Sequence, residues 1–318
     1  MKAVALFSGG LDSIIAVKLI ESQGITVQAI TFESSFFSAK KAKSAAKANN
    51  INLKVILIHK PYLEVVRNAK YGYGSGINPC KDCKIFMLKQ AWKYAKKIGA
   101  DFIFTGEVLN QRPMSQTKSA LDLIEYEAGV KGKLIRPLSA LKLKITDLEK
   151  KGKLKRENFL SINGRSRKEQ IKLAKKFNIK SYSTPAGGCI LCEKVISARL
   201  RDLFEHKKHV SINDAELIKL GRHFRVKDSK IIIGRNEEEN NKLMKLKQKN
   251  DYIFEVKNVG SPVTLLKGRK SKKIIRIAAE LTARYSDARN GNVEVNYSKG
   301  KIIVKKPLSF SERKYMII

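Results

Sequence analysis

Acidic residues are scarce in this sequence: 29 Asp and Glu stand against 65 Lys and Arg, which gives a formal net charge of +36 at pH 7. So large an excess of one sign is typical of proteins that meet a polyanion. Nucleic acid, an anionic membrane surface and acidic protein are the usual partners. Intrinsic disorder is not expected, because 43% of the 318 residues are hydrophobic, enough to form buried cores.

Long apolar runs are also missing, and none approaches the roughly 18–20 residues that a membrane-spanning helix needs. The apolar N-terminal stretch is interrupted by the polar segment SGGLDS, residues 8–13. No small-residue cleavage site typical of a signal peptide follows it. We therefore expect a cytoplasmic protein that has no membrane among its partners.

Cysteine is rare, and its four copies fall into two pairs of equal spacing, Cys80-x-x-Cys83 and Cys189-x-x-Cys192. Four cysteines do not make a disulfide framework in a chain of this length. In a reducing compartment the spacing indicates metal or sulfur chemistry. A zinc ribbon has roughly 15–20 residues between its pairs, far fewer than lie between these, so a zinc site would be assembled across the fold. Inert buried thiols are the remaining alternative.

Short apolar runs alternate with helical patterns over the first part of the chain. Strands are expected at 2–7, 25–32, 53–58 and 101–107, and helices at 14–20, 38–49, 85–100 and 167–179. Strand–helix alternation is typical of a parallel sheet with crossover helices. The sequence therefore predicts an α/β domain with a Rossmann-like parallel sheet, which we assign to residues 1–198.

From about residue 200 the pattern changes to short runs of high β-propensity separated by Gly, Asn, Asp and Pro. Strands are expected at 230–234, 252–259, 262–266, 293–297 and 301–306, with a helix at 274–289. This pattern predicts a second, smaller α+β domain, residues 199–318. Basic residues are plentiful in both parts and densest at 131–180, so both domains are expected to touch the same polyanion.

The segment SGGLDS lies between a predicted strand and a predicted helix, where a phosphate-binding loop is expected. Gly9 and Gly10 allow a tight turn and close approach of a ligand to the backbone. The N–H groups and the dipole at the helix N-terminus attract an anion. Ser8 and Ser13 add hydroxyl donors, and Asp12 is suited to hold Mg²⁺ against phosphates. The segment matches neither G-x-x-x-x-G-K-[ST] nor G-x-G-x-x-G, which argues against P-loop NTPases and dinucleotide enzymes.

SGGLDS in this position resembles the pyrophosphate loop (PP-loop) of the ATP pyrophosphatases, which cleave ATP to AMP and pyrophosphate by adenylating a substrate oxygen. TGEVLNQRPMSQT (105–117), followed by LIRPLSAL (134–141), resembles the TGE…GQ…SQT and RPL pattern of tRNA 4-thiouridine synthases. Asn110 stands where that pattern has glycine. NPCKDC (78–83) resembles the NPC-x-x-C element of tRNA 2-thiouridylases.

These resemblances imply an adenine nucleotide alpha hydrolase-like fold and an ATP-dependent tRNA sulfurtransferase, with ATP and Mg²⁺ as cofactors. Such an enzyme adenylates a uridine carbonyl oxygen and replaces it with sulfur, releasing AMP and pyrophosphate. Asp12, Cys80 and Cys189 are the implied catalytic residues. The expected nucleotide site consists of Ser8, Gly9, Gly10, Asp12, Ser13, Thr31, Phe32 and Gly106.

The cysteines have three possible roles in such an enzyme. Cys80, Cys83 and Cys189 match the pair-plus-one arrangement that holds a [4Fe–4S] cluster in related thiolases, with Cys192 as an uncertain fourth ligand. A persulfide with a resolving thiol is the second role, and a zinc site is the third. The sulfur donor is expected to be sulfide or a persulfide carrier. Pro185, Gly187 and Gly188, just before Cys189, favour a mobile loop.

Four blocks between residues 230 and 307 resemble, in order, the RNA-binding domain at the C-terminus of the NFACT proteins. The expected RNA contacts are Arg235, Lys267, Arg269, Lys270, Lys272 and Lys273. tRNA is therefore the expected partner. Two alternative functions stay open: an RNA- or ribosome-binding factor with a nucleotide-sensing PP-loop domain, and a PP-loop amidating ligase with structural zinc.

Overall fold

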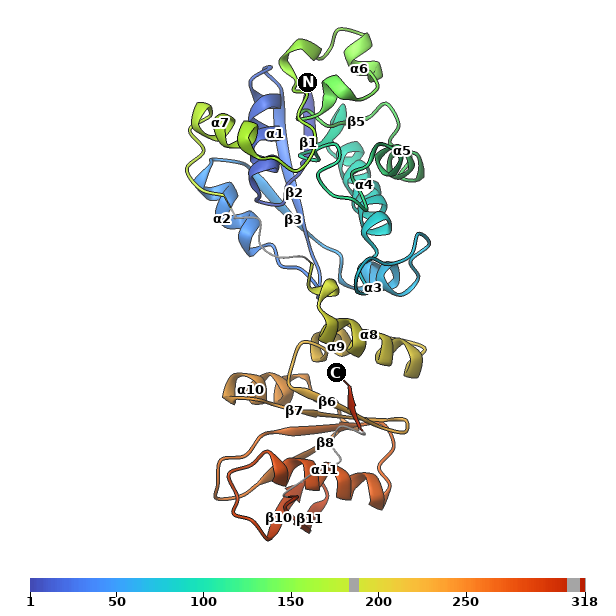
Figure 1. Ribbon diagram of the computed structural model, residues 1–318, viewed down its shortest axis with the longest axis vertical. Coiled ribbons are helices and arrows are strands. Elements are labelled where there is room, and N and C mark those ends of the chain that lie inside the picture. The colour runs from blue at the N-terminus through green and yellow to red at the C-terminus, as the bar shows by residue number, and fades with distance from the viewer. Residues whose placement is uncertain (183–188, 308–314, 318) are drawn as a thin grey trace. The chain divides into compact units, whose positions relative to one another are not determined.

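The computed structural model describes residues 1–182, 189–307 and 315–317, and its chain separates into two compact units, Met1–Cys192 and Glu193–Ile318 (Figure 1). The domain boundary predicted between residues 198 and 199 falls inside helix α8 (Lys194–His206). The assignment of domains itself stays a prediction. Among the helices that the structure describes, none is both long enough and apolar enough to cross a membrane.

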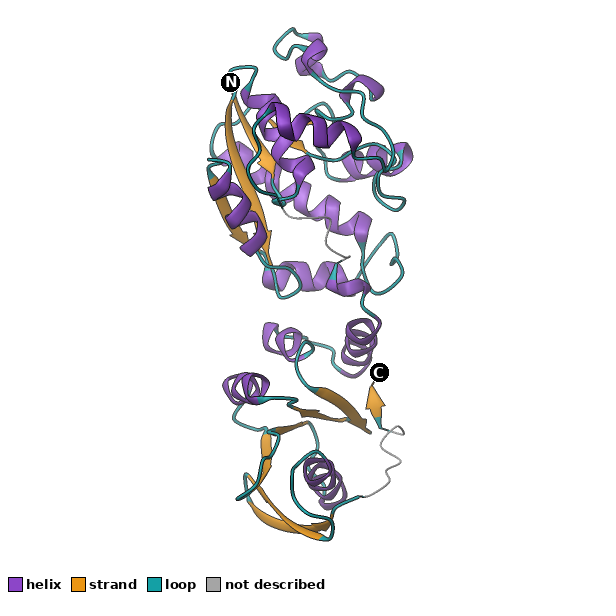
Figure 2. Cartoon of the chain, turned by 60° about the vertical axis from the view of Figure 1, so that its left-hand side comes forward, coloured by secondary structure: helices purple, strands orange, loops and turns teal. Residues whose placement is uncertain are grey.

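The first unit is built on a parallel sheet with the strand order β3-β2-β1-β4-β5 (Figures 1 and 2). Its strands are β1 (Lys2–Leu6), β2 (Thr26–Glu33), β3 (Leu53–Leu57), β4 (Phe102–Thr105) and β5 (Leu134–Ile135). All four neighbouring pairs run parallel. The predicted α/β fold with a Rossmann-like parallel sheet is thereby confirmed.

Helices cover both faces of this sheet (Figure 2). The α-helices are α1 (Leu11–Glu21), α2 (Lys40–Ala48), α3 (His59–Arg67), α4 (Cys80–Lys97), α5 (Lys118–Glu127), α6 (Asp147–Lys150) and α7 (Lys168–Lys176). Three short 3₁₀ helices, η1 (Ala140–Lys142), η2 (Arg156–Asn158) and η3 (Ile190–Cys192), complete the unit. Helix α4 begins five residues before the expected position, so both Cys80 and Cys83 lie in its first turn.

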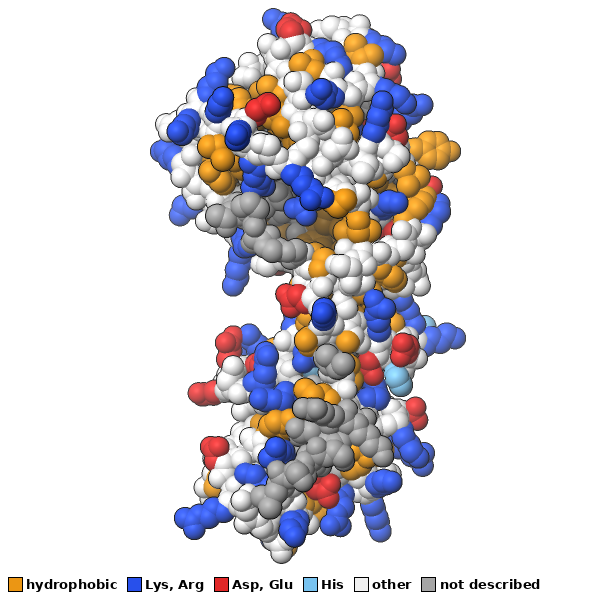
Figure 3. Space-filling view, viewed as in Figure 1, with side chains coloured by type: hydrophobic (Ala, Val, Ile, Leu, Met, Phe, Trp, Pro, Cys, Tyr) orange, Lys and Arg blue, Asp and Glu red, His pale blue; other side chains and the backbone are white. Residues whose placement is uncertain are grey.

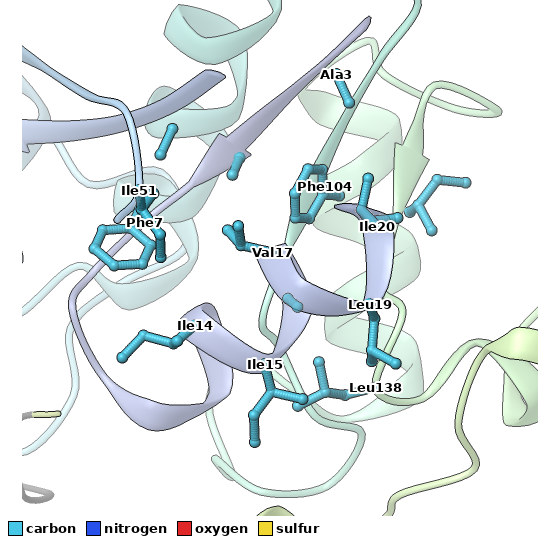
Figure 4. Close-up of a cluster of buried hydrophobic side chains, with 14 of the residues drawn as sticks. Ala3, Phe7, Ile14, Ile15, Val17, Leu19, Ile20, Ile51, Phe104 and Leu138 are labelled. Carbon is cyan, nitrogen blue, oxygen red and sulfur yellow. The ribbon is translucent and has the colours of Figure 1, made fainter. Parts of the chain in front are cut away.

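Helix α1 forms the centre of the core beside the sheet. Ile14 and Val17 are fully buried and lie with Phe104 of β4 in one apolar cluster (Figure 4). On its other side α1 packs against α7. A helix that is apolar on nearly all sides is typical of a buried position, so α1 is more buried than its predicted amphipathic pattern implied. This burial fixes the N-terminus of α1, and with it the loop that precedes the helix.

The second unit contains an antiparallel sheet with the strand order β11-β10-β8-β9-β7-β6-β12, and α11 packs against it (Figure 2). Its strands are β6 (Arg222–Val226), β7 (Ser229–Ile233), β8 (Tyr252–Val256), β9 (Thr264–Lys267), β10 (Asn292–Tyr297), β11 (Gly300–Lys305) and β12 (Met316–Ile317). Its helices are α8, α9 (Ile212–Leu217), α10 (Glu237–Leu246) and α11 (Lys272–Arg284). The predicted second α+β fold is confirmed.

Candidate active site

The segment from Ser8 to Ser13 joins β1 to α1 and has the geometry of an anion-binding loop. Gly9 has φ +78°, and a Cβ atom there would lie 2.8 Å from both the Ala42 Cα and the Lys41 carbonyl oxygen of α2. Only glycine fits such a position. Gly10 is the N-cap of α1, and no side chain caps the helix there. The first turn of α1 therefore presents its backbone N–H groups and positive dipole end to a ligand.

The loop lies where the strand order of the sheet reverses, between β1 and its neighbour β4. Crevices at this position, beyond the carboxyl ends of the strands, are where open α/β sheets bind ligands. Gly106 directly follows β4, and a Cβ atom there would lie 2.6 Å from the backbone of Asp12 and Ser13. The segment after β4 thus forms a wall of the loop. Thr31 and Phe32 lie buried near the carboxyl end of β2, the other neighbour of β1.

Asp12 lies in the first turn of α1 and is held by side chains from two distant segments. Its Oδ2 accepts a hydrogen bond from Gln111 Nε2 at 3.2 Å and lies 3.6 Å from Arg167 Nη2. Burial raises the pKa of Asp12 above its ordinary value, while Gln111, Arg167 and Gln170 act in the opposite direction. The buried Oδ1 accepts no hydrogen bond from the residues that the structure describes. This free oxygen fits the single carboxylate ligand that Mg²⁺ commonly takes beside phosphates.

Sequence reasoning missed Gln111 and Arg167 as partners of Asp12, and Gln170 as its buried neighbour. Gln170 is fully buried, and within the described parts of the chain neither atom of its amide group has a hydrogen-bond partner. All three residues lie in segments that the sequence analysis had noted. Gln111 belongs to the motif TGEVLNQ, and Arg167 and Gln170 belong to the basic segment GRSRKEQ. Only the packing of α7 against α1 brings that segment to the loop.

Asn110 departs from the glycine of the resembled pattern, and the backbone explains why the change is tolerated. Its φ is +59°, in the left-handed region that glycine adopts freely. Asparagine is among the few other residues enriched in this region. The loop therefore keeps the conformation that glycine would give it, and the adjacent Gln111 reaches Asp12.

Glu107 is a buried carboxylate that connects three segments around the loop. Its Oε2 lies 3.2 Å from Arg136 Nε, and its Oε1 lies 3.3 Å from Lys84 Nζ of α4. Arg136 in turn pairs with Glu125 of α5 at 2.9 Å. Burial alone would raise the pKa of Glu107, but the charges of Lys84 and Arg136 hold it below its usual range. The carboxylate thus stays ionised and fastens α4 beside the segment that walls the phosphate loop.

The two cysteine pairs meet within the first unit although they lie far apart in the sequence. The backbone N–H of Ile77 donates to the Leu191 carbonyl at 2.9 Å, so the segments carrying the two pairs are hydrogen-bonded to each other. Burial raises the pKa of Cys189 to about 11, and the neighbouring Cys83, Cys192 and Cys80 contribute to the rise. Pro185, Gly187 and Gly188, expected to form a mobile loop, lie outside the described residues.

The cysteines as they lie do not form a ready metal site. Within the parts of the chain that the structure describes, no group of three or more His, Cys, Asp or Glu side chains is arranged to hold a metal ion. A [4Fe–4S] cluster with an open iron requires three thiolate ligands, and a structural zinc requires four ligands. Both metal sites therefore stay predictions.

The residues expected to bind RNA occupy two places in the second unit. Five of them lie in one segment, from the end of β9 to the first turn of α11: Lys267, Arg269, Lys270, Lys272 and Lys273. Arg235 follows β7, whose end pairs with Thr264 at the beginning of β9, so Arg235 lies at the opposite end of that strand pair.

Two of these cations are already matched by carboxylates. Arg235 pairs with Glu239 at 2.5 Å, and Lys267 pairs with Asp251 at 2.8 Å. Lys272 and Lys273, by contrast, are exposed in the first turn of α11, where no acidic residue balances them.

The parallel sheet, the glycine loop at its strand-order reversal and the carboxylate in the first helical turn together define a PP-loop type of α/β domain. Comparison with known families agrees. Residues 1–153 match the family model described as thiamine biosynthesis protein (ThiI), and residues 221–313 match the model described as NFACT protein RNA binding domain. The two resemblances inferred from sequence are confirmed for these segments.

Several of the similar curated proteins share one name. The chain is 31% identical over 159 residues to the "Probable tRNA sulfurtransferase" of Alkaliphilus metalliredigens, covering 47% of this chain and 39% of that protein. It is 31% identical over 157 residues to the protein of the same name in Thermococcus kodakarensis, covering 47% and 40%. The chain thus spans well under half the length of these two relatives.

One solved structure is a "4-thiouridine synthetase - RNA complex with bound ATP". It is 21% identical and covers 56% of this chain and 51% of that one, with a TM-score of 0.35, too low for a comparison of folds.

Gly9→Ala tests the close approach between the loop and α2. Alanine in the left-handed region costs about 1–2 kcal/mol by itself, and at Gly9 the backbone of α2 must also move. Gly24→Ala is the matched control, because Gly24 has φ +75° and open space around its Cα. We expect Gly9→Ala to lower the unfolding midpoint of the first unit clearly more than Gly24→Ala does. Trp92, the single tryptophan, lies in α4. Its fluorescence therefore reports the unfolding of this unit. Equal losses would contradict the close approach.

Proposed function

We propose that this protein is an ATP-dependent tRNA sulfurtransferase that replaces a uridine carbonyl oxygen with sulfur. The observation that carries the proposal is that one folded unit contains both the phosphate loop and the two cysteine pairs. The buried ion pair between Glu107 and Lys84 fastens the cysteine-bearing helix beside that loop. The match of residues 1–153 to the ThiI model and the names of the curated relatives support the same activity.

The nucleotide half of the reaction follows from the loop. The first turn of α1 would hold the phosphates of ATP, with Gly106 as a wall and the carboxyl end of β2, Thr31 and Phe32, beside it. Asp12 Oδ1 would hold Mg²⁺, which supplies neutralisation of phosphate charge when bound. Arg167, 3.6 Å from Asp12 Oδ2, is placed to balance negative charge at the same point. Adenylation of the uridine oxygen would release pyrophosphate and turn that oxygen into a leaving group.

The sulfur half falls to the cysteines. A persulfide carrier would pass its outer sulfur to one cysteine thiolate and leave as its own thiolate, so that this cysteine becomes a persulfide. The persulfide would attack the ring carbon as AMP leaves with the former carbonyl oxygen. A second cysteine thiolate would then attack the remaining S–S bond, which leaves sulfur on the ring and a disulfide on the protein. No step is assigned to a cluster or to zinc.

Asp12→Asn tests the nucleotide half. The amide keeps the shape of the side chain but loses the negative charge that a metal–phosphate complex needs, so we expect at least a hundredfold loss of AMP formation. Asp122→Asn, at an exposed carboxylate of α5, is the matched control and should retain full activity. The measurement is AMP release from labelled ATP with tRNA, Mg²⁺ and a persulfide donor. Full activity of Asp12→Asn would refute the assigned role of this carboxylate.

The double variant Cys80→Ala, Cys189→Ala tests the sulfur half. Because the phosphate loop is unchanged, we expect pyrophosphate release from the adenylation step to persist while AMP formation and incorporation of labelled sulfur into tRNA are lost. Mass spectrometry of tRNA nucleosides measures the thiouridine. Unchanged thiouridine formation would remove the cysteines from the mechanism.

The second unit is proposed to hold the RNA. Lysine and arginine side chains together outnumber acidic side chains on the visible face of both units (Figure 3). Lys272 and Lys273 stand at the positive end of the α11 dipole, where cations are unfavourable by about 0.3–1 kcal/mol each. Such a placement costs stability unless a polyanion neutralises it. Arg269 and Lys270 precede them, so the segment 269–273 is the proposed phosphate contact.

Lys272→Gln, Lys273→Gln tests this contact, because loss of RNA affinity should come with a small gain in stability. We expect the slope of log binding constant against log salt concentration to fall by about one per lysine. The control Lys242→Gln, Lys245→Gln removes two exposed lysines from α10. Fluorescence anisotropy with labelled tRNA at several salt concentrations measures this slope for the variant and for the control. A slope equal to that of the wild type would contradict the proposed contact.

A further inference from the structure

Each sulfur of the Cys80-x-x-Cys83 pair receives a hydrogen bond from a different buried side chain. Tyr62 Oη of α3 donates to Cys83 Sγ at 3.2 Å, and Asn78 Nδ2 donates to Cys80 Sγ at 3.1 Å. Tyr62 is 1% exposed and Asn78 is 5% exposed. Neither residue belongs to the phosphate loop or to the predicted site.

Tyr62 is fixed by a surrounding group of aromatic rings. Phe37 meets it edge-on with ring centroids 4.9 Å apart, and Phe36 and Phe86 each lie 6.2 Å away. Burial raises the pKa of Tyr62 well above its usual value, and the nearby cysteines add to the rise. The hydroxyl therefore keeps its proton and acts as a donor. A hydroxyl buried among apolar rings is costly without a hydrogen-bond partner, and its partner here is Cys83 Sγ.

Asn78 is fixed by the backbone that precedes α4. Its Oδ1 accepts a hydrogen bond from the Gly76 N–H at 3.0 Å, which turns Nδ2 toward Cys80. Its carbonyl accepts from the N–H groups of Gly74 and Cys80, both at 3.0 Å. The amide oxygen of Asn78 therefore binds the loop before α4, and its amide nitrogen binds the sulfur of Cys80.

A neutral thiol is a weak hydrogen-bond acceptor, whereas hydrogen bonds to charged acceptors are about twice as strong. Two rigid donors aimed at two sulfurs thus suit sulfur in an anionic form, as thiolate or persulfide. Burial raises the pKa of Cys83, while the Tyr62 hydrogen bond and the positive charge of Lys84 act in the opposite direction. Since Tyr62 and Asn78 come from different segments, the two sulfurs are held independently of each other.

We propose that Tyr62 and Asn78 are positioning residues that hold the sulfur atoms of Cys83 and Cys80, respectively, for sulfur transfer, a role that rests on the proposed sulfurtransferase function. Neither residue exchanges atoms with substrate. Each fixes the rotamer of one cysteine through a hydrogen bond to its sulfur.

Tyr62→Phe removes the hydroxyl and keeps the ring, so it tests one contact alone. The probe is iodoacetamide at pH 8, without ATP, RNA or added metal, and mass spectrometry resolves the alkylation rate of each cysteine. Without the hydroxyl, Cys83 Sγ loses the hydrogen bond that holds its rotamer for attack. We therefore expect Cys83 to react about threefold more slowly and Cys80 to keep its rate. Tyr94→Phe, on α4, is the matched control and should change neither rate.

Asn78→Asp tests the second contact, because it replaces the donor by an acceptor of the same shape and keeps the oxygen that binds Gly76. We expect the rate of Cys80 to fall at least threefold and that of Cys83 to stay unchanged. Thermal unfolding checks that each variant is folded. Unchanged rates in both variants, or equal changes at both cysteines in either one, would overturn the proposal.

Activity distinguishes this proposal from the proposed function. In Tyr62→Phe we expect formation of thiouridine and AMP to fall while pyrophosphate release in the first turnover is retained, because the phosphate loop is untouched. A wild-type protein that thiolates tRNA but whose variants show no selective change in cysteine rates would overturn the positioning role alone. A wild-type protein that makes no thiouridine would overturn the sulfur-transfer role along with the proposed function, even with the selective rates observed.

Discussion

The buried carboxylate of Glu107 is the contact on which the arrangement of the first unit depends. It follows Gly106, whose backbone lies against Asp12 and Ser13, and it pairs with Arg136 and with Lys84 of α4. Removing one partner of a buried ion pair typically costs about 3–5 kcal/mol, because the remaining charges lose their compensation. Such a contact keeps the segment after β4, the helix bearing the cysteines and the phosphate loop in a fixed relation.

Two kinds of charge serve two different purposes in this protein. The net charge of +36 lies mostly on exposed lysines, which can attract RNA over a distance but specify no chemistry. The charges of the site are few, buried and paired, as with Asp12 and Arg167 or Glu107 and Arg136. In the second unit, pairing with Glu239 and Asp251 leaves Arg235 and Lys267 less able to contribute to RNA binding than the unmatched lysines of α11.

Local signals allowed much of the fold to be predicted, and long-range contacts explain the rest. Most strands of both sheets and the loop from Ser8 to Ser13 follow from apolar runs, glycines and β-propensity, which are properties of adjacent residues. Strands β5, β6 and β12 were not predicted. The beginning of α4 at Cys80 was missed because its first turn carries few apolar residues. Gln170 and Tyr62 could not be predicted as neighbours of Asp12 and Cys83, because those contacts depend on how α7 and α3 pack. The assigned roles of the cysteines stay predictions.

The most direct test of the central claim is the ratio of AMP formed to thiouridine formed when the protein is incubated with tRNA, ATP, Mg²⁺ and a persulfide donor. The account predicts one AMP and one pyrophosphate for each thiouridine, with neither product appearing when tRNA is omitted. Formation of ADP in place of AMP, or binding of RNA without any nucleotide cleavage, would contradict it.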